Sequence, residues 1–568
     1  MYAKTRQKMI TLPGIVCLLM IVLAACAGSG NNPTGNSLTA APPDKQILRM
    51  PVEGGDFDSL DPALTFAGLG DPYNLIYSGL VALTDSGTVV DQLAQSHQIS
   101  ADGLTYTFTL KSGLKFSDGT PITANDIAYS LNRVVLPATK SGVSNYLDLL
   151  KDYDKVLSSK IPTLIGDSII VKDSTTISLV ISKKAAYFLE SLTYSTGDVV
   201  PQKLIDKYGA KWTDHLEDGA ASGPFEVQSY GHTSSLVLVP NPNYSAFKPK
   251  LQKIIYTIAS DRDSNYKSYQ AGQYDLAPVP PTLDSLAKTK PGFQLVPALA
   301  SRFIGMNYLV KPLDNIKIRQ ALDLAINKDL IIGRIIGSSA TPSTHIVPKG
   351  IPGYNQNLMG PDGVASTAGN ATKAQALFKQ GLQEEGYSSV SQFPALTIDY
   401  DISYQNGANT IIAIVAEWKQ ILGITVKAVG VQHDQLPQDI ANTAGNKSLQ
   451  LWYGVWSTDY PDPQDWLTLF FGKNALHNSF NYGQNTSSAA PEQQAVQAEL
   501  AQADAEQDPT ARIKLYQDAE QKIVNDVGWI TTYQASYLYS VNPKLQNWKL
   551  NPLGSIATSD WANIYFAQ

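Results

Sequence analysis

The chain has 568 residues, of which 43% are hydrophobic and 16% charged, so it holds enough apolar material for about two to four structural units with large cores. Its formal net charge is −7, and because phosphate binding needs a basic surface, this charge argues against a nucleic-acid partner. The two cysteines are Cys17 and Cys26, which excludes a disulfide framework and a cysteine-based metal site from the rest of the chain.

The N-terminal segment has the pattern of a secretion signal. Three basic residues precede an apolar run over residues 10–23, which is too short to span a membrane comfortably. The run ends in Leu23-Ala24-Ala25-Cys26, which resembles the lipobox of bacterial lipoproteins. This resemblance implies a signal peptide over residues 1–25 and lipidation of Cys26, which would become the mature N-terminus. An ordinary signal peptide or a short anchor is the alternative.

Residues 26–43 are predicted to form a lipid-anchored flexible tether, because they are rich in Gly, Ser, Asn, Thr and Pro and nearly devoid of bulky apolar residues. A flexible chain of this length reaches roughly 20–25 Å. No later segment offers 18 uninterrupted apolar residues, so nothing else is predicted to cross a bilayer. The protein is therefore predicted to be held at the outer face of the cytoplasmic membrane, in an extracellular or periplasmic location.

The body of the chain alternates between strand and helix patterns. Residues 104–110 alternate apolar residues with threonine, which is the period of a half-buried strand. Thr123 and Asp126 form a capping pair for a helix that carries Ile127, Leu131 and Val134. Further strands are predicted at residues 47–50, 169–171, 177–181, 236–239, 396–400 and 424–429. Helices are predicted around residues 318–326, 411–418 and 513–527. This alternation indicates an α/β protein with a mixed sheet.

The stretch from Leu451 to Phe471 contains three acidic residues among aromatic rings and no Lys or Arg. Asp462 precedes Pro463, a favoured first helical residue, and Asp465 follows three residues later, so both are predicted to cap a helix and to compensate its dipole. Asp459 has no such duty, although it could be a turn residue before Pro461. An unpaired carboxylate beside aromatic rings suits a site that receives a cation.

Seven blocks that lie in order along residues 47–568 carry a family resemblance. They are Ser59-Leu60-Asp61-Pro62, residues 93–133, Gly223-Pro224-Phe225, Asn241-Pro242-Asn243-Tyr244, Ala271-Gly272-Gln273-Tyr274-Asp275, Ile318-Arg319-Gln320-Ala321-Leu322, and the stretch 451–471. Together they resemble the solute-binding proteins of bacterial peptide-import ABC transporters, the oligopeptide- and dipeptide-binding family. The ordered set covers essentially the whole predicted mature chain.

The resemblance implies an α/β, bilobal clamp like that of periplasmic binding proteins, with an extra domain inserted in the first lobe. Two passages of the chain, near residues 300 and 535, would form the hinge, and closure would be favoured by bound ligand. The expected parts are lobe I (residues 44–90, 200–300 and 535–568), the inserted domain (91–199) and lobe II (301–534).

By the same resemblance, Asp459 in the pattern Trp456-Ser457-Thr458-Asp459 pairs with the α-ammonium group of a peptide. Trp456 would wall the pocket or be buried in its lobe. Backbone groups of Val455 and Ser457, and of Gly68 and Leu69 on the other lobe, would pair with the peptide like added strands. Val455 departs from the family pattern, which often has Gly before the Trp. Arg302, near the lobe junction, is expected to have a hinge or surface role.

The resemblance implies a monomeric, lipid-anchored receptor that delivers peptides to a permease and its ATPase. An oligosaccharide ligand is an alternative, since the rings of Trp452, Tyr453, Trp456 and Trp466 could stack on sugars; relatives also bind nickel complexes or haem. A secreted hydrolase or a scaffold lipoprotein is a further alternative. However, the sequence lacks a Gly-x-Ser-x-Gly elbow, a Walker-type loop and paired histidines, so no enzyme, metal site or cofactor is predicted.

Overall fold

The computed structural model describes residues 38–67, 70–259 and 261–568. The elements with assigned secondary structure belong to one compact unit, Ala40–Gln568. The predicted signal peptide, Cys26 and most of the tether lie outside the described residues, as do Gly68 and Leu69.

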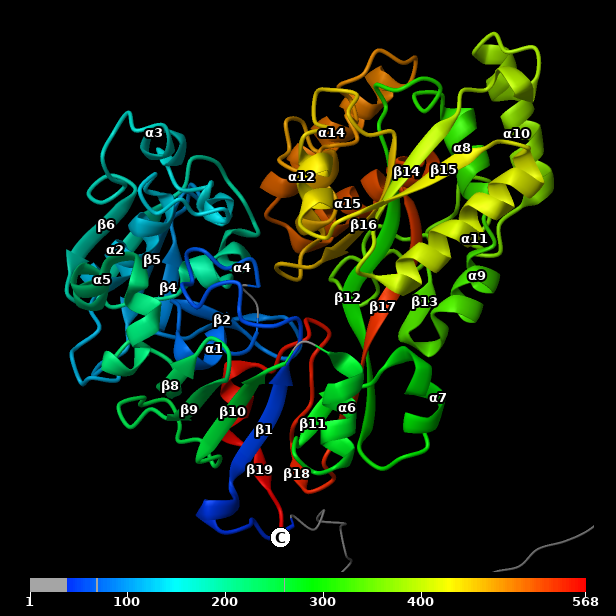
Figure 1. The fold of residues 1–568 in the computed structure, drawn as a ribbon. Helices are drawn as coiled ribbons and strands as arrows, with labels where there is room; N and C mark the ends of the chain where they lie inside the picture. The colour runs from blue at the N-terminus through cyan, green and yellow to red at the C-terminus, as the bar shows by residue number, and fades with distance from the viewer. Residues whose placement is uncertain (1–37, 68–69, 260) are drawn as a thin grey trace, which may run out of the picture. The chain divides into compact units, whose positions relative to one another are not determined.

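A first sheet joins the N-terminal strand to strands from the middle of the chain (Figure 1). Its order is β1 (Ile47–Val52), β10 (Lys253–Ile258), β9 (Ser235–Pro240) and β8 (Phe225–Gly231). β1 runs parallel to β10 and the other pairs are antiparallel. Its core contains Leu48, Phe225, Leu236 and Ile254, together with Trp561 from near the C-terminus. Residues far apart in the sequence therefore build one core. The short elements that accompany it are α1 (Tyr73–Ile76), α5 (Gln202–Tyr208), α6 (Arg262–Gln270), and the strand pairs β2 (Val81–Leu83) with β3 (Val89–Asp91) and β18 (Leu545–Gln546) with β19 (Tyr565–Phe566).

A second, antiparallel sheet is built from residues 94–180. Its order is β4 (Ala94–Ile99), β5 (Thr105–Leu110), β7 (Thr176–Val180) and β6 (Ile169–Asp173). Helix α2 (Ala124–Val135) begins after Thr123 with a reciprocal capping box to Asp126, which confirms the prediction from sequence. Its apolar face packs with β5 and β7 in one core. The shorter helices here are α3 (Tyr153–Leu157) and α4 (Phe188–Ser191).

The third sheet has seven strands and contains the stretch that begins at Leu451. Its order is β11 (Leu276–Pro278), β17 (Ile530–Val541), β12 (Phe293–Met306), β16 (Leu451–Ser457), β14 (Leu396–Asp401) and β15 (Val426–Val431), with β13 (Ala340–Pro342) paired to β17. Its helices are α7 (Asp284–Ala287), α8 (Ile316–Leu324), α9 (Lys328–Ile335), α10 (Ala371–Glu384), α11 (Gln405–Leu422), α12 (Gln435–Ala441), α13 (Thr468–Phe471), α14 (Ala490–Ala505) and α15 (Pro509–Asn525). The strands and helices predicted between residues 318 and 527 are confirmed, and β15 begins two residues later than expected.

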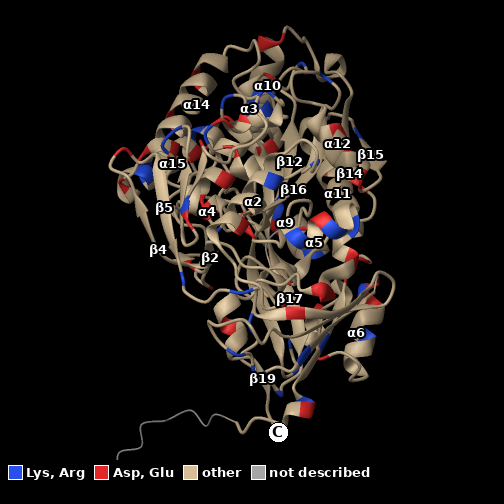
Figure 2. Ribbon diagram, turned by 90° about the vertical axis from the view of Figure 1, so that its left-hand side faces the viewer, with Lys and Arg blue, Asp and Glu red and all other residues tan. Residues whose placement is uncertain are grey.

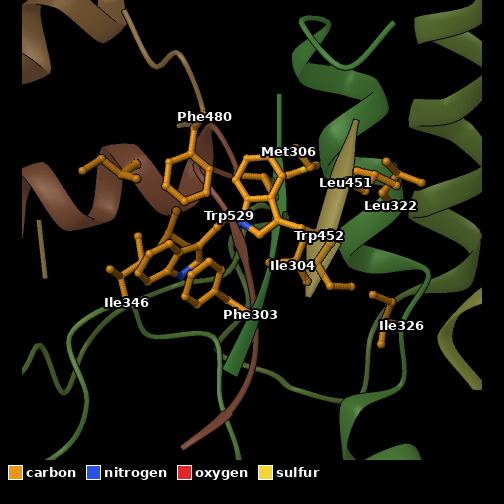
Figure 3. Packing of buried hydrophobic residues seen from close by; sticks show 14 of the residues in the cluster. Phe303, Ile304, Met306, Leu322, Ile326, Ile346, Leu451, Trp452, Phe480 and Trp529 are labelled. Atoms are coloured by element: carbon orange, nitrogen blue, oxygen red, sulfur yellow. The ribbon is translucent and has the colours of Figure 1, made fainter. Parts of the chain in front are cut away.

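Aromatic residues fill the core on one face of this sheet, as Figure 3 shows for Phe303, Trp452, Phe480 and Trp529. The rings of Phe303 and Trp529 stack with centroids 3.9 Å apart. Gly305 is required beside them, because a Cβ atom at this position would lie 2.1 Å from the Trp452 ring. This packing holds β12 and β16 firmly side by side, and it is β16 that leads into Asp459.

Charged residues of both signs are interspersed along the ribbon, as the blue and red segments of Figure 2 show. Among the described residues, no helix is long and apolar enough to cross a membrane. The same part of the chain contains no group of three or more His, Cys, Asp or Glu residues placed to hold a metal ion.

Candidate functional site

The loop that follows β16 is shaped by a buried carboxylate. Asp465 Oδ2 accepts hydrogen bonds from the hydroxyl of Thr458 (2.8 Å), the backbone N–H of Asp459 (3.0 Å) and the indole N–H of Trp456 (3.4 Å). Trp466 also donates to Thr458 Oγ1 at 3.0 Å. These bonds fix the backbone of Asp459. Asp465 lies in the first turn of the 3-10 helix Pro463–Asp465 and has a structural role, as predicted. It does not cap this helix, however, because its side chain turns back to organise the loop.

Asp462 does cap this turn, as predicted, because its Oδ1 accepts from the backbone N–H of Gln464 at 2.8 Å. The structure adds an ion pair that the sequence did not indicate. Both carboxylate oxygens of Asp462 receive N–H donors of Arg512 at 2.7 Å. Arg512 thus neutralises Asp462, and this acid is not available to a ligand.

Asp459 lacks a basic partner: among the described residues, no Lys, Arg or His forms an ion pair with it. Its carboxylate accepts a hydrogen bond from the hydroxyl of Tyr146, which lies 313 residues earlier. Burial raises the pKa of Asp459 to about 7 from its usual 3.8, although the Tyr146 bond acts in the opposite direction. Burial also raises the pKa of Asp465 well above its usual value, and the charge of Asp459 adds to this shift. The ligand-free site therefore disfavours the ionised carboxylates, and a ligand cation would stabilise them.

Aromatic rings pack around Tyr146, whose hydroxyl contacts this carboxylate. The Tyr146 ring stacks on Tyr194 with centroids 4.0 Å apart and meets the edge of Tyr460 at 6.4 Å. Tyr460 in turn stacks with Tyr187 at 6.2 Å. Sequence reasoning missed Tyr146, Tyr187 and Tyr194, because no local pattern links residues 146–194 to Asp459.

A cavity of about 360 Å³ adjoins these rings. Tyr146, Tyr187 and Tyr460 line it, together with Asp148 and Asp504. Burial raises the pKa of both carboxyl groups to about 6. The wall also contains Lys183 and Lys473, so charged groups of both signs line this space together with the aromatic rings.

Val455 and Ser457 lie where one edge of β16 is open. On its first side β16 pairs with β12 over its whole length, with Val455 opposite Arg302. On its other side β14 pairs with it only at Leu451 and Trp452. No other strand of the described residues pairs with β16. The backbone from residue 453 onward therefore offers a free edge, with which an extended ligand could pair as an added strand.

The side chains at this edge differ in exposure. Val455 is 48% exposed, whereas Trp456 is only partly exposed and packs edge-on against Phe470, with ring centroids 4.8 Å apart. Trp452, Tyr453 and Trp466 are at most 2% exposed. Of the four rings expected to be able to stack on sugars, three are therefore in the core, and that part of the oligosaccharide prediction is wrong.

Comparisons with known proteins agree with this geometry. Residues 88–478 match the family model described as bacterial extracellular solute-binding proteins, family 5 middle. The chain is 27% identical over 536 residues to the oligopeptide-binding protein OppA of Bacillus subtilis, covering 92% of this chain and 93% of the relative. It is 26% identical over 488 residues to the probable deoxycholate-binding periplasmic protein YgiS of Escherichia coli, covering 84% and 85%.

Solved structures show the same fold. The Escherichia coli murein tripeptide binding protein MppA superposes with a TM-score of 0.73 at 23% identity, covering 93% of this chain and all of that one. An oligopeptide-binding protein from Borrelia burgdorferi gives a TM-score of 0.71 at 25% identity, covering 90% and 98%. The predicted α/β bilobal clamp is therefore confirmed.

Proposed function

Because the chain belongs to the bacterial extracellular solute-binding proteins of family 5, we propose that it captures peptides with a free N-terminus and delivers them to the permease of an ABC importer. Members of this family are binding proteins of transport systems, and this chain is accordingly not an enzyme. Because the relative YgiS is described as a probable deoxycholate-binding protein, a peptide ligand is a proposal for this chain.

The single observation that carries the proposal is the unpaired carboxylate of Asp459. A peptide α-ammonium is the cation that would neutralise it, and the two groups would form a charge-assisted hydrogen bond. Burial makes the pairing selective, because a carboxylate left alone in a desolvated site costs about 3–5 kcal/mol. Tyr146 already orients the carboxylate from one side. The raised pKa of Asp459 shows that the ligand-free site penalises the charged form.

The open edge of β16 supports an extended peptide as the rest of the ligand. Main-chain pairing with Val455 and Ser457 would hold a peptide without reading its side chains. Trp456 would contribute its partly exposed ring as a wall, and the half-exposed Val455 side chain would contact the ligand directly. The backbone groups of Gly68 and Leu69, on the other lobe, would pair with the peptide from the opposite side.

We also propose the anchoring and the domain organisation. The lipobox-like end of the leader supports lipidation of Cys26, which would hold a monomer at the outer membrane face beside its permease and ATPase. The proposed parts are lobe I (residues 44–90, 200–300 and 535–568), an inserted domain (91–199) and lobe II (301–534). Three large cores support this division, and the core of the inserted domain also takes in Ala63, Leu80, Val81 and Tyr460 from the neighbouring parts.

Blocking the peptide amine tests the proposed function. Calorimetry of the purified protein with a random tripeptide pool should show binding that is lost when the pool is N-acetylated, because the acetyl group removes the charge that Asp459 would pair with. Equal binding of both pools would contradict the role of Asp459. Cello-oligosaccharide binding without any response to peptides would favour a sugar ligand instead.

Peptide binding should release a proton. At pH 6 most molecules still carry a proton on the Asp459–Asp465 pair, since the pKa of Asp459 is about 7. An incoming ammonium would favour the ionised form and so displace this proton. Affinity should therefore rise with pH from about 5.5 to 7, before the peptide amine itself begins to deprotonate near pH 8. Calorimetry at pH 6 in buffers of different ionisation enthalpy should report close to one proton released per peptide. Release that is unchanged in Asp459→Asn would assign the proton to another group.

A further inference from the structure

Asp198 carries a second carboxyl group that lacks a partner within the described residues. It follows the 3-10 turn Ser195–Gly197, and its backbone is held by a 2.9 Å hydrogen bond to the Ser195 carbonyl and by a β-bridge to Gly79. The side chain is partly buried, yet its carboxyl group forms no hydrogen bond and no ion pair with another described residue. Burial by itself raises the pKa of Asp198 well above its usual value. A cation from outside the protein would stabilise the ionised form.

Asp198 lines a cavity of about 60 Å³. The wall comes from residues 70–83, from Gln92, Thr193 and Asp198 itself, and from residues 551–558 near the C-terminus. One water needs about 10–15 Å³ of such space, so the cavity has room for the end of a long side chain. Among the described residues that line it, none is Lys, Arg or His. No basic group of the wall therefore balances the carboxylate.

The other polar groups of this wall are mainly hydrogen-bond acceptors. The hydroxyl of Thr193 already donates to a backbone carbonyl at 2.7 Å, and that of Ser555 donates to Asn551 Oδ1 at 3.3 Å. Because a hydroxyl has one hydrogen, both groups keep only lone pairs for a further partner. Asn74 Oδ1 is buried without a hydrogen bond, and Gln92 and Asn551 add uncharged amides. Such a wall suits a group with several N–H donors, such as an ammonium or a guanidinium.

A chain of contacts connects this cavity to Asp459. Thr193 of the wall is followed by Tyr194, whose ring stacks on Tyr146 with centroids 4.0 Å apart. Tyr146 in turn donates its hydroxyl hydrogen to the carboxylate of Asp459. Two stacked rings therefore lie between the wall of the cavity and the proposed site for the peptide amine.

A second contact links the same two places. The turn between β2 and β3 lies against the loop that carries Asp459, because a Cβ atom at Gly87 would be 3.0 Å from the Pro461 ring. β2 itself lines the cavity. In the proposed division the wall belongs to lobe I and the inserted domain, whereas Asp459 belongs to lobe II. A ligand with its amine at Asp459 and a side chain at Asp198 would contact both sides.

We propose that Asp198 binds a basic side chain of the ligand, so that the protein prefers peptides with a lysine or arginine close to their free N-terminus. This inference rests on the proposed function and adds a class of peptide to it. The ammonium or guanidinium group would form a charge-assisted hydrogen bond with Asp198 and donate to the neighbouring oxygen acceptors. The two cationic groups of such a ligand would then bridge lobe II and the wall of the cavity.

The test uses calorimetry with alanine tripeptides that carry lysine or norleucine at position one, two or three. Norleucine has an unbranched side chain like that of lysine but lacks the ammonium group. In the wild type, lysine at one of these positions should bind at least about tenfold more tightly than norleucine, because only lysine supplies the partner of a buried carboxylate. Asp198→Asn should abolish this preference and retain the penalty of N-acetylation. Asp518→Asn, which changes an exposed residue of α15, should keep both.

A lysine preference in Asp198→Asn equal to that of the wild type would overturn the proposal, as would a wild type without any preference at the three positions. Acetylation separates these results from failure of the proposed function. If acetylation abolishes the binding of trialanine and lysine brings no gain, only the role of Asp198 is wrong. If acetylation has no effect while the lysine preference depends on Asp198, the role of Asp459 is wrong instead.

A small inorganic cation is the competing occupant of the cavity. Calcium chloride or potassium chloride that raises the Tm of the peptide-free wild type, but not that of Asp198→Asn, would overturn the proposal. An equal response of the two proteins supports a side chain of the ligand. Asp198→Asn should fold, because it replaces an unpaired carboxyl group by an amide of similar size. If it does not, the comparison of lysine with norleucine on the wild type still decides whether the preference exists.

Discussion

Replacing Asp459 by Asn is expected to weaken the binding of free-amino peptides by at least about a hundredfold. The amide keeps the size of the side chain, but it leaves the ligand ammonium desolvated and without a counter-charge, which costs about 3–5 kcal/mol. Calorimetry or fluorescence titration with a tripeptide gives the ratio of dissociation constants. The variant should also lose most of the wild-type preference for free over N-acetylated peptides.

The matched control for this variant is Asp518→Asn. Asp518 forms an exposed i,i+4 pair with Lys514 on α15, and such surface pairs contribute little. The Asp518→Asn variant should bind peptides as tightly as the wild type. A loss of less than about threefold in Asp459→Asn would remove the main support for the proposed function, since it would mean that no cation binds there.

Replacing Asp526 by Ala is expected to lower the free energy of unfolding by about 3–5 kcal/mol. Its partner Arg319 is completely buried, donates to the backbone carbonyls of Asp526 and Leu313 at 2.9 and 3.0 Å, and lies 4.1 Å from the centroid of the Tyr308 ring. Removing the carboxylate would leave this guanidinium buried without a counter-ion. The measurement is urea unfolding followed by tryptophan fluorescence.

Asp518→Ala serves as the control for stability and should change the free energy of unfolding by less than about 0.5 kcal/mol. Asp526→Ala should retain the acetylation penalty under native conditions, because neither Asp526 nor Arg319 belongs to the proposed ligand site. A stability loss below about 1 kcal/mol would mean that water or another group compensates Arg319.

Two arginines show what a sequence motif does and does not specify. Arg319 belongs to one of the blocks that carry the family resemblance, yet its duty is structural, since it joins α8 to the end of α15 through Asp526. Arg302 belongs to no such block, yet it is partly buried, stacks on Tyr404 and forms no ion pair with another described residue. Motif membership identified the family, but the burial and partners of each side chain assign its role.

Local patterns were sufficient for the secondary structure. The capping pair of Thr123 and Asp126, the alternation over residues 104–110 and the apolar spacing around Trp418 each depend on neighbours within one turn or one strand. Such interactions are short-range, so their residue spacing is visible in the sequence. The same holds for Asp462, whose capping bond spans two residues.

The site depended on contacts between distant residues. The sequence by itself determined that Asp459 had no local structural duty and that the family was one of solute-binding proteins. Only the tertiary structure decided that Tyr146 donates to Asp459, that Asp465 shapes the loop, that Trp452 and Trp466 are buried, and that Arg302 lies opposite Val455. The physical reason is that burial and charge balance arise when strands and loops far apart in the chain pack together, and residue spacing along the chain carries no record of that packing.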